Sequence, residues 1–164
     1  MAASSRFLIL MRHGKSSYPD GVGDHGRPLA PRGIREAALA GDWIRRTQPP
    51  VDAILCSTAT RTRLTLAAVG IDAPTVYSDL LYGATPAQVL HAIAGTDPDV
   101  LTLLVIGHAP GIPGAAMALD PRSRHADRMS DKFPTSAVAT LTVSDTWAGI
   151  HAAGATLTAF HVPR

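Results

Sequence analysis

Two arginines and two histidines follow apolar stretches of this sequence. They are Arg12 and His13 after FLILM, Arg61 after AILCS, and His108 after LTLLVIG. A neutral imidazole can attack phosphorus as a nucleophile, and guanidinium groups bind phosphoryl oxygens and offset their charge. These residue types therefore predict phosphoryl-transfer chemistry, provided that the fold brings the three segments together.

Neighbouring features suit the same chemistry. Gly14 follows the first histidine and lets the backbone approach a ligand closely. A helix that begins between Ser57 and Arg61 would direct the positive end of its dipole at an anion. The second histidine could donate a further hydrogen bond to a phosphoryl oxygen.

The elements that must position these residues are predicted from apolar runs and helical periodicity. Strands are expected over residues 6–11, 52–56, 75–77, 101–106, 136–143 and 155–162, and the last two are expected to pair. Helices are expected over residues 31–46, 59–69, 85–94 and 110–119, with a loop over 16–32 and a polar excursion over 120–133.

Local signals refine the helices. The residues that share an apolar face of the first helix are Ile34, Ala37, Ala38, Gly41 and Ile44. Ser57 and Thr58 are good capping residues for the second helix. Thr85 is the expected cap of the third helix, with Pro86 at its first position.

The alternation of strands and helices predicts an α/β protein in three layers, with a mostly parallel central sheet, an antiparallel edge and helices on both faces. A chain of 164 residues fits one domain over residues 1–164. Such sheets bind ligands at the carboxyl ends of their strands, so the loops that carry the arginines and histidines should share one edge.

Composition excludes several classes. The net charge is +2 and no run of five Lys or Arg occurs, so a nucleic-acid partner is not expected. No stretch approaches the roughly 20 apolar residues of a membrane span. The N-terminus lacks the apolar core of a signal peptide, and the single cysteine excludes an intramolecular disulfide. A cytoplasmic location is therefore expected.

No metal or cofactor is expected. No two histidines lie four residues apart and no cysteine pair exists. GVGDHG, residues 21–26, matches a dinucleotide-binding pattern but neither follows a strand directly nor opens a helix. Cysteine-dependent phosphatases use Cys-x5-Arg, but that spacing from Cys56 reaches Thr62 and not Arg61. Cys56 is instead expected to end a buried strand.

Three blocks in order resemble the histidine phosphatase superfamily. LMRHGKSS matches its Arg-His-Gly signature, CSTATRTRLT resembles its Ser-x-x-x-Arg-x-x-x-Thr stretch, and VIGHAPGI resembles the block with its second histidine. RPLAPRG and FPTSAVATL look like the small SixA-like phosphohistidine phosphatase branch. The resemblance covers about residues 6–143 and implies the phosphoglycerate mutase-like fold.

The resemblance implies roles for individual residues. His13 would be the nucleophile that becomes phosphorylated, and Arg12, Arg61 and His108 would form the phosphate pocket. Ser16 falls on a position that a hydroxyl-bearing residue often occupies in the family, and it would touch phosphate.

The neighbouring loop offers two further cations. Lys15 is either a substrate-steering residue or a solvated loop lysine. Arg27 is expected to be a loop or structural residue.

The general acid is open among three aspartates. DLLYG resembles a family pattern in which a Glu precedes an aromatic-Gly pair, with Asp79 in place of the Glu. Asp20 and Asp24, in the loop near His13, are the rivals. Imidazole leaves more easily than an alkoxide, so phosphohistidine hydrolysis tolerates a poor acid.

The expected function is removal of phosphate from protein phosphohistidine through a phosphoenzyme. The alternatives are a broad small-molecule phosphomonoesterase, a mutase-like enzyme, and a phosphate- or phosphopeptide-binding module without catalysis. Only 36 positions separate Thr65 from Leu101, which leaves little room for a lid. Whether loop 16–32 closes over the site is open.

Asp79→Asn tests the assignment of the acid. If Asp79 protonates the leaving group, the variant slows phosphoester hydrolysis by up to about 10²–10⁴-fold and phosphohistidine hydrolysis less. The measurement is kcat/KM on both substrates. Equal losses on the two would exclude Asp79 as the acid.

Overall fold

A computed structural model describes residues 5–164. Its strands are β1 (Arg6–Arg12), β2 (Ala53–Ser57), β3 (Thr75–Ser78), β4 (Thr102–Gly107), β5 (Val138–Val143) and β6 (Ala155–His161). Its α-helices are α1 (Pro31–Thr47), α2 (Thr60–Val69), α3 (Pro86–Ala94), α4 (Gly111–Leu119) and α5 (Ala126–Asp131). Two short 3₁₀ turns are η1 (Asp24–Gly26) and η2 (Asp79–Leu81).

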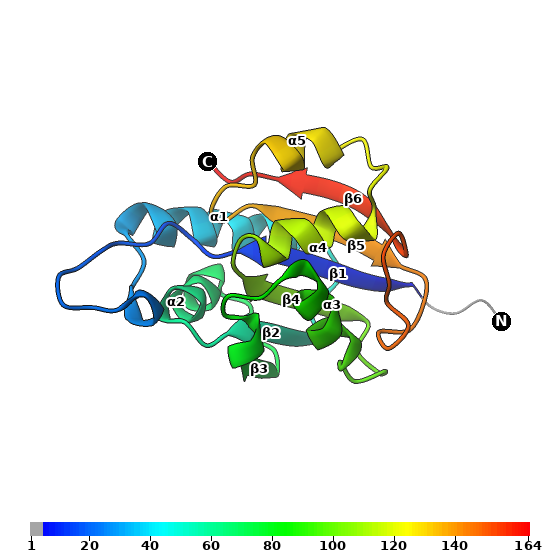
Figure 1. Cartoon of the computed structure of the whole chain (residues 1–164), viewed down its shortest axis with the longest axis horizontal. Coiled ribbons are helices and arrows are strands. Elements are labelled where there is room, and N and C mark those ends of the chain that lie inside the picture. The colour runs from blue at the N-terminus through cyan, green and yellow to red at the C-terminus, as the bar shows by residue number, and fades with distance from the viewer. Residues whose placement is uncertain (1–4) are drawn as a thin grey trace.

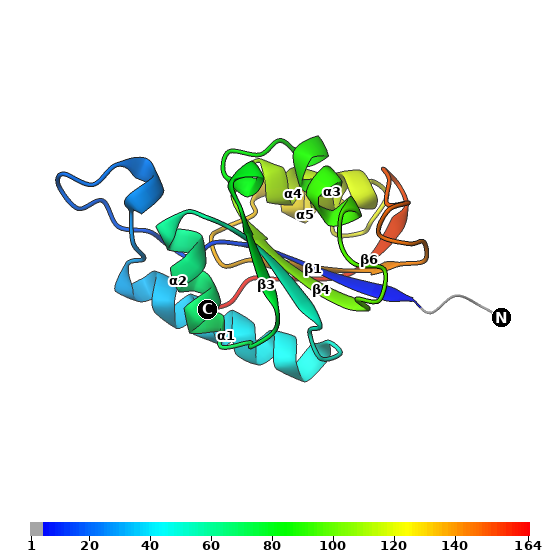
Figure 2. The same ribbon diagram turned by 90° about the horizontal axis from the view of Figure 1, so that it is seen from below.

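The six strands form one sheet in the order β3-β2-β4-β1-β5-β6 (Figure 1). Strands β3, β2, β4 and β1 run parallel, and β5 and β6 complete the sheet with antiparallel pairings. Helices α1 and α2 cover one face, and α3, α4 and α5 lie on the other (Figure 2). The predicted three-layer fold with an antiparallel edge is therefore confirmed.

Strand β1 is buried on both faces because helices cover both faces of the sheet, while β4 and β5 pair with its two edges. Its side chains alternate between two cores, as the strand period of two requires. Leu8 and Leu10 pack with residues of α3 and α4, whereas Ile9 and Met11 pack with residues of α1 and α2. This anchoring on both faces fixes the end of β1, where Arg12 and His13 lie.

Three local predictions were wrong. Ile34 is half exposed, while Ala37, Gly41 and Ile44 of the predicted face are buried. The N-cap of α2 is Ala59 rather than Ser57 or Thr58. The polar excursion 120–133 contains α5, a single short helix with only Met129 buried.

Other local predictions hold. Thr85 caps α3 in a capping box with Gln88, and Pro86 occupies the first turn.

Within residues 5–164 no helix is long and apolar enough to cross a bilayer. The prediction of one domain over residues 1–164 stays a prediction.

Gly41→Ala tests the close packing of α1 on α2. A Cβ at Gly41 would overlap the carbonyl oxygen of Val69 at the end of α2. We expect the free energy of unfolding to fall by about 1–3 kcal/mol, although alanine favours helix over glycine. Urea unfolding measures the change. Gly23→Ala, where a Cβ meets nothing within 4 Å, is the control, and equal stability of the two variants would contradict the packing.

Candidate active site

The carboxyl ends of β1, β2 and β4 bring the two histidines together. Arg12 pairs with Gly107 in the parallel ladder, and the backbone N–H of His13 donates to the Gly107 carbonyl at 3.0 Å. The rings of His13 and His108 lie 5.1 Å apart between centroids. Both side chains are almost fully buried.

One hydrogen bond defines the reactive nitrogen of His13. Its Nδ1 lies 2.7 Å from the carbonyl oxygen of Gly14. Because a carbonyl oxygen can only accept, Nδ1 carries the proton. The lone pair of a neutral His13 is therefore on Nε2, as a nucleophile requires.

Gly14 is fixed by contacts from two helices. Its N–H donates to the Thr65 hydroxyl at 2.9 Å, and that hydroxyl donates to the Arg61 carbonyl at 2.6 Å. A Cβ on Gly14 would lie 2.8 Å from the Gly33 carbonyl oxygen, so no side chain fits. Arg61 and Thr65 of the Arg-x-x-x-Thr motif, both in α2, thus position Gly14, and the Gly14 carbonyl in turn orients the His13 ring.

The two arginines enter the site from different elements. Arg12, at the end of β1, donates a hydrogen bond from Nη1 to the Phe133 carbonyl at 2.9 Å. Arg61 lies in the first turn of α2 and is 6% exposed. The Nε atoms of both are buried and have no hydrogen-bond partner among residues 5–164. A phosphoryl group offers the acceptors that these donors lack.

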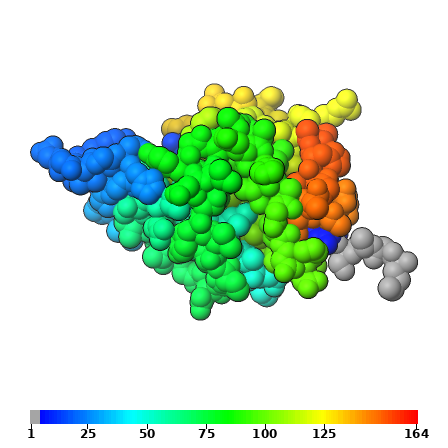
Figure 3. All heavy atoms as spheres, turned by 60° about the horizontal axis from the view of Figure 1, so that its bottom comes forward, coloured from blue at the N-terminus to red at the C-terminus, as the bar shows by residue number. Residues whose placement is uncertain are grey.

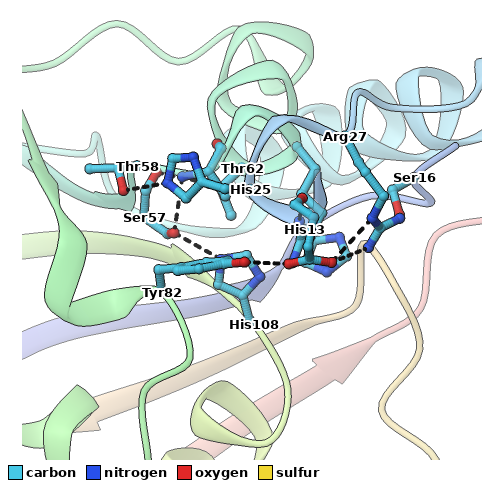
Figure 4. Close-up of polar contacts among 12 residues, drawn as sticks. His13, Ser16, His25, Arg27, Ser57, Thr58, Thr62, Tyr82 and His108 are labelled. Carbon is cyan, nitrogen blue, oxygen red and sulfur yellow. Dashed lines mark hydrogen bonds and ion pairs between the residues drawn. The ribbon is translucent and has the colours of Figure 1, made fainter. Parts of the chain in front are cut away.

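His108 is held by Ser57. Its Nε2 lies 2.8 Å from the Ser57 hydroxyl, which also accepts a hydrogen bond from the Ala59 N–H (Figure 4). If the hydroxyl donates to Nε2, the proton of a neutral His108 is on Nδ1. That nitrogen is buried without a partner in the described part of the chain, so it can serve a ligand.

Burial, reinforced by the nearby cations, keeps both imidazoles neutral. Burial, followed by the charges of Arg61, Arg12 and Arg27, lowers the pKa of His13 to about 4 despite the opposing bond to Gly14. Burial, followed by His13 and Arg61, lowers the pKa of His108 to about 3. His13 is therefore uncharged at neutral pH, with its one proton on Nδ1.

Sequence reasoning underestimated Arg27. Its guanidinium donates to the Ser16 hydroxyl at 2.6 Å (Figure 4). It also forms an ion pair with Asp24 at 3.1 Å and stacks on the Tyr18 ring, 4.2 Å from its centroid. Because its charge also acts on the pKa of His13, Arg27 is a third cation of the site. Its three-residue spacing from Asp24 was the available signal. Ser16 is buried and contacts Arg27, whereas Lys15 is exposed.

The loop between β1 and α1 folds back against α2. The backbone carbonyl of Asp24, in η1, accepts a hydrogen bond from Nη1 of Arg61 at 2.8 Å. Nε2 of His25 lies 3.0 Å from the hydroxyl oxygen of Thr58. In the space-filling view the loop, in blue, projects from one end of the molecule (Figure 3). The glycine-rich pattern 21–26 is part of this loop and opens no α-helix.

The three candidate acids occupy different places. Asp24 contacts Arg61 and the Tyr82 hydroxyl. Asp79 lies at the start of η2 and accepts from the Thr58 hydroxyl at 2.6 Å. Asp20 is exposed. The structure thus places Asp24 in contact with Arg61, and the acid role of Asp79 stays a prediction.

Cys56 is buried in β2, as expected, and burial raises the pKa of its thiol to about 12. It is therefore a poor nucleophile at neutral pH. Across residues 5–164 no group of three His, Cys, Asp or Glu is placed to hold a metal ion.

Comparisons place this site in a family. The model of the histidine phosphatase superfamily (branch 1) matches residues 8–81. A Mycobacterium tuberculosis protein is 54% identical over 158 residues, which cover 94% of this chain and all of the relative. A solved structure provisionally described as phosphohistidine phosphatase SixA from Nakamurella multipartitia has a TM-score of 0.92 and 40% identity, and the match covers 99% of each chain.

A SixA structure complexed with tungstate has a TM-score of 0.79 at 23% identity, over 96% of this chain and 97% of that chain, and shares the fold. The chain therefore belongs to the histidine phosphatase superfamily, in its SixA-like branch.

A histidine titration followed by NMR tests the electrostatics. Since burial and the arginines disfavour the charged imidazoles, His13 and His108 should titrate near pH 4 and pH 3, below the usual value of about 6.5. Both rings then stay neutral down to about pH 5. His13→Ala and His108→Asn assign the signals, and a midpoint near 6.5 for His13 would contradict the description.

Proposed function

We propose that this protein is a phosphatase that removes phosphate from protein-bound phosphohistidine through a phosphoenzyme on His13. The observation that carries the proposal is the state of that residue. Its Nδ1 bonds to Gly14, its pKa is lowered to about 4 by burial and nearby arginines, and its Nε2 lone pair is free. The likeness to a protein provisionally named phosphohistidine phosphatase supports the substrate class.

The first step is an in-line attack on phosphorus. Nε2 of His13 forms a bond to phosphorus while the bond to the leaving group breaks. Arg12 and Arg61 bind the equatorial oxygens and offset their negative charge, and His108 donates from Nδ1. Because these cations neutralise the phosphoryl group, the proposed reaction uses no metal or cofactor.

The second step is hydrolysis of the phosphoenzyme. Water attacks phosphorus, the bond to Nε2 breaks, and inorganic phosphate leaves. The electron pair returns to Nε2, while the Gly14 carbonyl holds the Nδ1 proton throughout. The site is then ready for another turnover.

The exposure of the mouth suits a phosphohistidine carried on a protein. Tyr18 is 72% exposed and Tyr82 36% exposed, although the catalytic histidines behind them are buried. A side chain that projects from a partner protein could reach such a site. The cytoplasmic location predicted from the sequence would give access to such partners.

His13→Ala tests the nucleophile. We expect loss of turnover on a phosphohistidine-bearing peptide and on p-nitrophenyl phosphate, with the fold retained by circular dichroism, because the variant lacks the proposed nucleophile. Radiolabelled substrate with an alkaline quench should label wild-type protein on His13 and leave the variant unlabelled.

The outcomes separate the alternatives. Retained turnover in a clean preparation of the variant would exclude the mechanism. Wild-type activity on the ester alone would point to a small-molecule phosphomonoesterase or mutase-like enzyme. Binding of phosphate without turnover of either substrate would indicate a binding module.

A further inference from the structure

A carboxylate lies among the cations at the mouth of the site. Oδ1 of Asp24 accepts hydrogen bonds from Nε of Arg27 at 3.2 Å and from Nη2 of Arg27 at 3.1 Å. Oδ2 accepts hydrogen bonds from Nη2 of Arg61 at 3.2 Å and from the Tyr82 hydroxyl. The side chain of Asp24 is nevertheless 57% exposed, so a substrate can reach it.

This carboxylate is ionised. The hydrogen bond from Tyr82, followed by the charge of Arg61 and the bonds from both arginines, lowers the pKa of Asp24 to about 2. Asp24 therefore has no proton to give to a leaving group at neutral pH. An anion beside a phosphate pocket also repels a phosphoryl group, so its placement calls for a role that uses the negative charge.

The tyrosine that contacts this carboxylate packs against two further rings. Tyr82 is edge-on to His25, with centroids 4.8 Å apart, and edge-on to His108 at 5.5 Å (Figure 4). A carboxylate beside aromatic rings suits a flat heteroaromatic ring that carries a positive charge. A protonated phosphohistidine ring has both properties.

We propose that Asp24 recognises the leaving group, by accepting a hydrogen bond from the protonated ring nitrogen of the substrate phosphohistidine. This inference rests on the proposed function. When a phosphoryl group binds, Arg61 turns an N–H from Oδ2 of Asp24 to a phosphoryl oxygen. The released lone pair of Oδ2 then accepts the ring N–H.

The step balances without an acid from the protein. Nε2 of His13 bonds to phosphorus as the P–N bond of the substrate breaks. The electron pair of that bond goes to the departing ring nitrogen. The ring leaves as neutral imidazole and keeps the proton on its other nitrogen, which Asp24 holds. The carboxylate thus favours the protonated form of the substrate, in which the ring is the better leaving group.

A phosphoester gains nothing from Asp24. Its leaving oxygen has no N–H to donate, and the developing negative charge is repelled by the carboxylate. Asp24 is therefore a specificity residue, which favours phosphohistidine over phosphoesters within one phosphate pocket.

Asp24→Asn tests this role with two small probes, phosphoimidazole and p-nitrophenyl phosphate. Hydrogen bonds to charged groups correspond to about 10- to 100-fold in kcat/KM. We expect a loss of that size on phosphoimidazole, and no loss or a gain on the ester because the repulsion of its leaving oxygen is removed. Asp72→Asn, at an exposed aspartate that follows α2 and has no role in the site, should match wild type on both probes.

The inhibition constant of inorganic phosphate separates recognition from positioning. If Asp24 only orients Arg61, the variant binds phosphate more weakly and loses equally on both probes, which would overturn the inference. Unchanged or tighter phosphate binding with a selective loss on phosphoimidazole supports it. Wild-type protein that cleaves the ester and not phosphoimidazole would refute the proposed function, and the inference with it. Equal losses in an enzyme that cleaves phosphoimidazole refute the inference alone.

Discussion

The hydrogen bond from Nδ1 of His13 to the Gly14 carbonyl is the contact on which the site depends. It places the free lone pair on Nε2 and fixes the ring at the end of β1. The bond holds only if the Gly14 peptide cannot turn, and Thr65 from α2 together with Gly33 from α1 prevents that. Helices α1 and α2 thus hold the His13 ring in place through the backbone of Gly14.

The second feature is a cation cluster beside a histidine that stays uncharged. Burial is the largest cause of the lowered pKa of His13, and the charges of Arg61, Arg12 and Arg27 act in the same direction. The arginines thus place positive charge beside a neutral imidazole, which is the arrangement that the proposed phosphoryl transfer requires. Asp24 balances part of this charge at the exposed end, where Arg61 and Arg27 meet.

The strands, and the loops that carry the candidate site residues, could be predicted from the sequence because their signals are local. Apolar runs such as those of β1 and β4 reveal buried strands, and polar residues directly after them mark the carboxyl edge. Helix α5 was missed because ADRMSD has one buried residue and no helical periodicity. Ser57 was assigned to a cap because its sequence position suits one, but its hydroxyl is used by His108.

The mouth of the site could not be predicted in the same way. Arg27, Asp24 and Tyr82 meet only because loop 16–32 folds back on α2 and η2, and that path is set by tertiary contacts rather than by periodicity. Asp24 was recognised as a candidate acid, but its charge state depends on Tyr82, which is 58 residues away.

The chain's single thiol has a consequence for how the protein tolerates oxidation. Cys56 is buried in β2, and burial raises its pKa to about 12, so little thiolate forms to react with peroxide. The nucleophile that we propose, the imidazole of His13, is not a thiol. Oxidising conditions that inactivate an enzyme with a cysteine nucleophile would therefore leave the proposed reaction intact.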